Sequence, residues 1–60
     1  MTKKLNNQTG CYKIDIFLNG TYLCSTDQSK TCKDAVNKYA ARYYNGNIPK
    51  GLKAYFFYHN

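Results

Sequence analysis

Residues 12–26 read YKIDIFLNGTYLCST, and this sequence predicts a β-hairpin. Apolar residues recur at every second position of its first half, at Tyr12, Ile14, Ile16 and Leu18. That period is typical of a half-buried strand. Asn19-Gly20 follows directly, and both residue types accept the positive φ of a type I′ turn. Thr21–Thr26 is then the returning strand of the hairpin.

A two-residue turn also predicts which residues of the two strands face each other. The expected pairs are Leu18 with Thr21, Phe17 with Tyr22, Ile16 with Leu23, and Asp15 with Cys24. One face of the hairpin would then enter the core, with Ile14, Ile16, Leu18 and Leu23. The opposite face would carry Lys13, Phe17, Tyr22 and Cys24, so two aromatic rings lie where a protein with one helix has little to cover them.

The following segment predicts a helix that begins after Thr31 and ends near Asn45. Thr31 and Asp34 resemble a capping box, in which the Thr hydroxyl accepts the N–H of the third helical residue, and Ser29 is an alternative N-cap. Gly46 is expected as the left-handed residue after the helix. Apolar residues at three- and four-residue spacing predict its buried side, formed by Cys32, Val36, Tyr39, Ala40 and Tyr43.

Leu52–His59 predicts the last strand, which is rich in aromatic residues. Its side chains alternate, so Ala54, Phe56 and Tyr58 point one way and Lys53, Tyr55, Phe57 and His59 the other. We expect Tyr55 and Phe57 on the uncovered face, although a β-bulge would exchange the two sets.

The predicted fold class is α+β, with the element order β-β-α-β. A right-handed crossover and the apolar first strand favour a three-stranded antiparallel sheet of order 2-1-3, with the helix packed on one face. Residues 11–60 form this single small domain. Residues 1–10 are polar and lack periodicity, so they are expected to be a flexible N-terminal arm.

The composition excludes several classes of protein. The chain has 60 residues, of which nine are Lys or Arg and three are Asp, and its formal net charge is +6. Such a chain is one domain at most and attracts polyanions. No apolar run is long enough to span a membrane, and the first residues lack the apolar region of a secretory signal. The expected location is therefore cytoplasmic (intracellular), without a membrane partner.

Catalysis and metal binding find little support in the residue pattern. The three cysteines, Cys11, Cys24 and Cys32, contain no Cys-x-x-Cys pair and are expected to be reduced. His59 is the only histidine and lies next to the last residue. We therefore expect no enzyme activity, no metal, no cofactor and no small-molecule substrate.

The charge and the aromatic residues instead predict a small basic nucleic-acid-binding protein, largely without sequence specificity. Bases stack on aromatic rings, and phosphates bind Lys and Arg. The expected stacking residues are Phe17, Tyr22, Tyr55 and Phe57. The expected phosphate contacts are Lys13, Lys30, Lys33, Lys38, Arg42, Lys50 and Lys53, and Lys3 and Lys4 on the arm would add backbone contacts.

The alternative is a protein-interaction module that binds no nucleic acid. The aromatic face would then form a homodimer, because small domains often gain stability by association. The chain would otherwise dock, as an inhibitor or accessory subunit, on an acidic surface of a larger protein. The sequence does not decide between these two hypotheses, nor between DNA and RNA as the nucleic acid.

Overall fold

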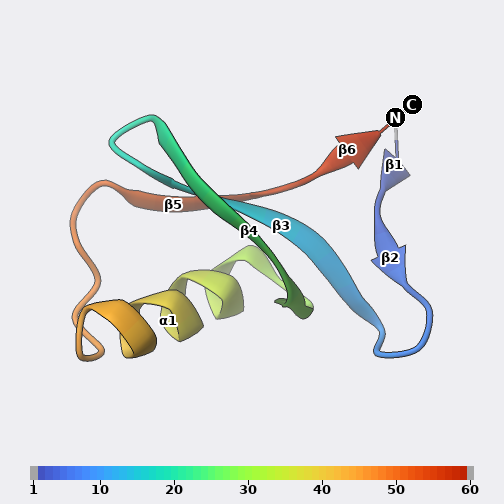
Figure 1. Ribbon diagram of the computed structural model, residues 1–60, viewed down its shortest axis with the longest axis horizontal. Helices are drawn as coiled ribbons and strands as arrows, with labels where there is room; N and C mark the ends of the chain where they lie inside the picture. Colours follow the sequence, from blue (N-terminus) through green and yellow to red (C-terminus); the bar gives the residue numbers. More distant parts are fainter. Residues whose placement is uncertain (1, 60) are drawn as a thin grey trace.

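A single helix lies against one face of an antiparallel sheet (Figure 1). The computed structural model describes residues 2–59. The helix is α1 (Cys32–Tyr43), and the strands are β1 (Thr2–Lys3), β2 (Leu5–Asn6), β3 (Cys11–Leu18), β4 (Thr21–Ser29), β5 (Leu52–Phe56) and β6 (Tyr58–His59). The α+β class and the β-hairpin are confirmed.

The sheet has more strands than the sequence predicted. The three long strands take the expected order, with β3 between β4 and β5. However, β2 also pairs with β3, which makes a four-stranded sheet, and β1 pairs with β6 in a separate two-stranded sheet. The prediction of a three-stranded sheet was therefore wrong.

The additional strands come from residues 1–10, which were expected to be a flexible arm. On one edge of β3, pairing with β5 stops at Ile14, and pairing with β2 resumes at Tyr12. Between them, the Lys13 N–H donates to the Lys4 carbonyl at 2.9 Å. The N-terminal segment thus fills the part of the β3 edge that β5 leaves free, because buried backbone groups need partners.

The hairpin turn has the predicted conformation, with φ of 51° at Asn19 and 82° at Gly20. Leu18 pairs with Thr21 and Phe17 with Tyr22, as expected, but Ile16 pairs with Cys24 and Asp15 with Ser25. The predicted register was thus wrong beyond the first two pairs, because Leu23 is an extra residue in β4. This bulge lets Leu23 and Cys24 both pack against the core, whereas a regular strand would turn one of them away.

The helix begins as the capping pattern predicts. The Thr31 hydroxyl accepts the Asp34 N–H at 3.1 Å. The helix ends earlier than expected, at Tyr43, and Gly46 has a φ of 86°. Tyr43 was expected to be buried but is 58% exposed, and Tyr44 packs against the core in its place.

The core lies between α1 and the sheet and is small. Its buried apolar residues are Ile14, Ile16, Ala35, Ala40 and Leu52. Ala54 and Phe56 pack against them, so the alternation of β5 turns Lys53 and Tyr55 to the opposite face of the sheet. The expected last strand is interrupted at Phe57, after which β6 leaves to pair with β1.

Candidate nucleic-acid interface

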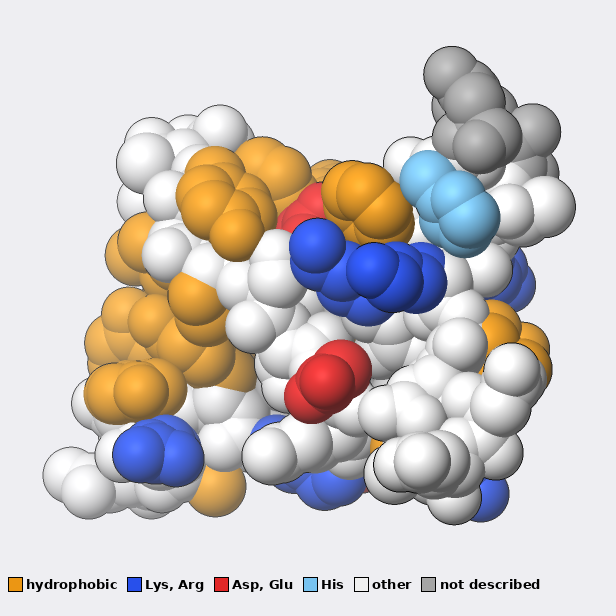
Figure 2. Space-filling view, turned by 45° about the vertical axis from the view of Figure 1, so that its right-hand side comes forward, with side chains coloured by type: hydrophobic (Ala, Val, Ile, Leu, Met, Phe, Trp, Pro, Cys, Tyr) orange, Lys and Arg blue, Asp and Glu red, His pale blue; other side chains and the backbone are white. Residues whose placement is uncertain are grey.

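The face of the sheet opposite α1, called the open face below, gathers aromatic and basic side chains. Apolar side chains and lysines lie next to one another on the surface in Figure 2. Register and alternation assign to it Lys13, Asp15 and Phe17 of β3, Tyr22 and Ser25 of β4, Lys53 and Tyr55 of β5, and the following Phe57.

Three aromatic rings of the open face form one cluster across three strands. The Phe17 ring contacts the Tyr22 ring with centroids 5.7 Å apart and the Tyr55 ring with centroids 5.6 Å apart, both edge-to-face. Tyr22 is 55% exposed and Tyr55 is 56% exposed, while Phe17 between them is half-buried. Phe17 therefore supports two rings that remain accessible to a ligand.

A chain of polar contacts beside the cluster holds Tyr22, and no pattern in the sequence predicted it. Ser25 Oγ donates to Asp15 Oδ1 at 2.6 Å and is 2.8 Å from the Tyr22 hydroxyl oxygen. The bulge at Leu23 makes this chain possible, because it places Ser25 rather than Cys24 opposite Asp15.

Phe57 is less available for stacking than the two tyrosines. The Lys13 ammonium lies 4.3 Å from the Phe57 ring centroid, and the His59 ring is stacked on Phe57 with centroids 6.3 Å apart. The cation–π contact holds Lys13 at the surface of the open face. Phe57 is thus already in contact with Lys13 and His59 and offers less free ring surface than the two tyrosines.

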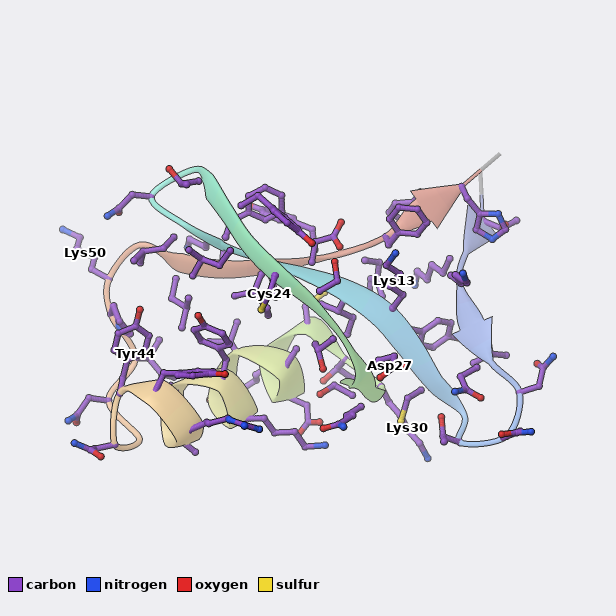
Figure 3. All side chains as sticks on the ribbon, in the orientation of Figure 1. Lys13, Cys24, Asp27, Lys30, Tyr44 and Lys50 are labelled. Atoms are coloured by element: carbon purple, nitrogen blue, oxygen red, sulfur yellow. The ribbon has the colours of Figure 1, made fainter. Side chains whose placement is uncertain are left out.

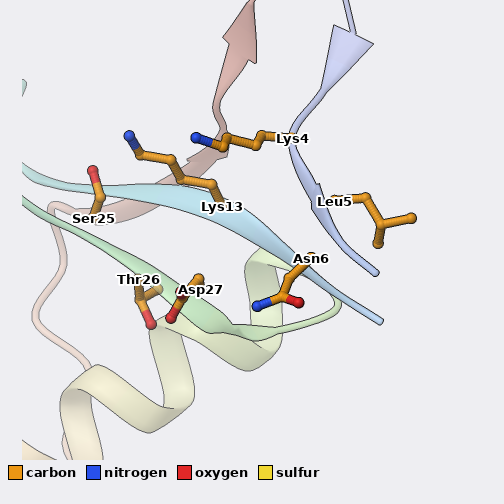
Figure 4. A pocket seen from close by; sticks show the side chains of 7 residues that line it. All are labelled: Lys4, Leu5, Asn6, Lys13, Ser25, Thr26 and Asp27. Atoms are coloured by element: carbon orange, nitrogen blue, oxygen red, sulfur yellow. The ribbon is translucent and has the colours of Figure 1, made fainter. Parts of the chain in front are cut away.

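A hollow of about 470 Å³ adjoins the cluster and crosses β3. Figure 4 shows the Lys4 side chain pointing toward that of Lys13 on one side of the β3 ribbon, with Asn6 and Asp27 on the other side. Leu5, Ser25 and Thr26 complete the lining. Lys4 was expected only as a mobile backbone contact, and the pairing of the N-terminal segment with β3 brings it to this hollow.

The remaining predicted cations do not join the open face. Lys33, Lys38 and Arg42 are exposed on α1, on the other side of the sheet. Lys30 precedes α1, and Lys50 lies in the loop before β5, at the opposite end of the molecule in Figure 3. The predicted residues thus do not form one continuous surface.

Lys38 already has partners within the protein. Its ammonium donates to the Gln28 carbonyl at 2.6 Å and lies 3.2 Å from Asp34 Oδ2. This pair follows the i,i+4 spacing on the helix surface. The hydrogen bond from Lys38 holds the pKa of the Asp34 carboxyl below its ordinary value.

The cysteines are free thiols, each half-buried. Burial raises the pKa of the Cys32 thiol, so the thiolate that reacts or binds metal is disfavoured there. Among residues 2–59, no cluster of three or more His, Cys, Asp or Glu residues is placed to hold a metal ion. The helix of the described chain is too short and too polar to cross a membrane.

Comparisons with protein-family models, with curated proteins and with solved structures gave no match for this chain.

Proposed function

We propose that this protein binds single-stranded nucleic acid, without catalysis and largely without sequence specificity, on the open face of its sheet. The observation that carries the proposal is the ring cluster of Tyr22, Phe17 and Tyr55, bordered by Lys13 and Lys53. Bases of a single strand stack on exposed rings, and its phosphates bind nearby ammonium groups. In a duplex the bases are already stacked on each other, so the rings would contribute little.

The two tyrosines are the proposed stacking residues. Both rings are more than half exposed, and the contacts with Phe17 limit their motion. The Ser25 hydroxyl further orients Tyr22. A ring that is ordered before binding loses little conformational freedom on contact with a base.

The proposed phosphate contacts are Lys13, Lys53 and Lys4. Asp15 lies on the open face and Asp27 lines the adjoining hollow, and both carboxylates reduce the positive charge near these lysines. Although they weaken the attraction to phosphates, these carboxylates can accept hydrogen bonds from the amino groups of bases. The hollow beside Lys4 and Lys13 is large enough to hold an unpaired base near these groups.

A chemical-shift titration of the isotope-labelled protein with oligothymidylate tests the location directly. The proposal predicts changes at Phe17, Tyr22 and Tyr55 that saturate with the oligonucleotide. Changes confined to Lys33, Lys38 and Arg42 of α1 would contradict it and would support a phosphate-binding helix.

A homodimer that buries the same aromatic face is the second candidate, because two half-exposed tyrosines lie side by side with Phe17. Such a dimer would bring Lys13 and Lys53 of one copy toward those of the other, and like charges disfavour this contact. Sedimentation of the wild type and of Tyr55→Ala separates the two functions. A dimer that Tyr55→Ala dissociates, with nucleic-acid affinity intact, would support the dimer.

A further inference from the structure

A second hollow, of about 290 Å³, is a groove between β4 and α1, on the helix side of the sheet. Its inner part is formed by Ala35, which is buried, and by the half-buried Cys24 and Tyr39. Exposed Lys38, Arg42 and Tyr43 line its helical side. Ser25, Thr26 and Asp27 of β4 line both hollows, but none of the open-face aromatic residues lines this groove. Its helical side therefore lies outside the proposed nucleic-acid interface.

The strand that borders the groove has a free edge. β4 pairs with β3 on one side, and within residues 2–59 no strand pairs with its other side. The pairing of β4 is regular from Cys24 to Thr26 and shifts register on both sides of that stretch. Beyond this stretch, the Gln28 carbonyl already accepts a hydrogen bond from the Lys38 ammonium, so it is not available to pair with an added strand. The free edge is therefore short, and bulged edges resist the addition of long strands.

The groove is most positive at its Arg42 end. The only ion pair among the described residues joins Lys38 to Asp34, so Arg42 has no acidic partner there. Its guanidinium carbon lies 5.6 Å from the Tyr43 ring centroid. Asp27 is the one acid in the lining, beside the Gln28 carbonyl that Lys38 binds. Arg42 lies one helical turn further along α1, away from that acid.

We propose that this groove binds a short extended peptide segment that carries acidic residues. The peptide backbone pairs with β4 at Cys24–Thr26, as in peptide recognition by strand addition. One apolar side chain of the peptide packs over Ala35 and Tyr39, and a neighbouring carboxylate binds Arg42. This inference does not depend on the nucleic-acid proposal, because the side chains that would bind the peptide, Ala35, Tyr39 and Arg42, are not among the proposed nucleic-acid contacts.

The probe is a short fluorescein-labelled peptide of alternating glutamate and valine, titrated into the full chain. A second peptide with lysine in place of glutamate controls for the charge. The proposal predicts saturable binding of the glutamate peptide only, with amide shift changes at Cys24–Thr26 and along α1. Absence of saturation, equal binding of both peptides, or shift changes confined to Phe17, Lys53 and Tyr55 of the open face would overturn it.

Arg42→Ala and Lys33→Ala form a matched pair, since both residues are exposed cations of α1 and only Arg42 lines the groove. Arg42→Ala is expected to lower the affinity for the glutamate peptide about two- to fivefold, the usual effect of losing a partly exposed ion pair. Lys33→Ala and Tyr55→Ala should leave its affinity unchanged. Equal loss in Arg42→Ala and Lys33→Ala would show general charge attraction and overturn the groove assignment.

Discussion

The Phe17 ring meets the Tyr55 ring edge-to-face, with centroids 5.6 Å apart and planes inclined by 70°. The contact joins the central strand β3 to β5 on the open face, and the same Phe17 ring contacts Tyr22 of β4. One half-buried residue therefore fixes the spacing of two accessible rings. This spacing is the basis of the proposed stacking surface.

Removal of an accessible ring should weaken single-strand binding. Tyr22→Ala and Tyr55→Ala are each expected to cost about 1–3 kcal/mol of binding free energy, the usual contribution of one base–ring stack. Fluorescence anisotropy with labelled oligothymidylate measures the loss. Tyr43→Ala is the matched control, because Tyr43 is equally exposed but lies on α1. An equal loss in Tyr43→Ala would contradict the assignment to the open face.

Removal of an open-face cation should change the salt dependence of binding. Each of Lys13→Ala and Lys53→Ala is expected to reduce the slope of log affinity against log salt concentration by about 0.7, the value for one single-strand phosphate contact. Titrations over a series of salt concentrations give this slope. Lys33→Ala should leave it unchanged, and a slope unaltered in both open-face variants would exclude them as phosphate contacts.

The close approach of Gly51 to the hairpin turn predicts a large effect on stability. The Asn19 N–H donates to the Gly51 carbonyl at 3.0 Å, and a Cβ on Gly51 would collide with the Asn19 side chain. Gly51→Ala should lower the free energy of unfolding by about 1–3 kcal/mol, as overpacking does. Urea denaturation measures it, with exposed Asn47→Ala as a near-neutral control. Equal midpoints for the two variants would contradict the account of this contact.

The Asp34–Lys38 pair predicts a pH effect with a definite sign. The pKa of Asp34 is lowered in the folded protein, chiefly by its hydrogen bond with Lys38. The stabilisation is thus present above the ordinary carboxyl pKa of about 4 and is lost as the pH falls through the lowered folded value. NMR titration of the Asp34 carboxyl should show a return toward the ordinary pKa in Lys38→Gln, and no change in Lys33→Gln. An unchanged Asp34 titration in Lys38→Gln would rule out the pair as the cause.

Local chemistry made part of the fold predictable. Asn19-Gly20 specifies its turn because both residues tolerate positive φ, and Thr31 caps α1 through its own hydroxyl. The alternation of side chains in the last strand correctly predicted that Phe56 faces α1 and that Tyr55 lies on the open face. Each of these features depends on residues near one another in the sequence.

Features that depend on distant partners were not predictable in this way. β1 forms only because β6, at the other end of the chain, offers a pairing edge. β2 pairs with nearby Cys11 and Tyr12, but at two residues it is too short to show a periodic pattern in the sequence. The bulge at Leu23 follows from the packing of Leu23 and Cys24 against the core. No Gly, Asn or other turn residue marks the position of this bulge in the sequence. The contacts among Asp15, Ser25 and Tyr22 depend on that bulge, so they were not predictable from the sequence either.

The most direct test of the central claim compares labelled single-stranded and duplex oligonucleotides of equal length by anisotropy, at low and at moderate salt. Stacking on Tyr22 and Tyr55 predicts tighter binding of the single strand at both salt concentrations. It also predicts that the preference disappears when both tyrosines are replaced by alanine. Equal affinity for the two forms in the wild type would contradict the stacking surface and leave only attraction between charges.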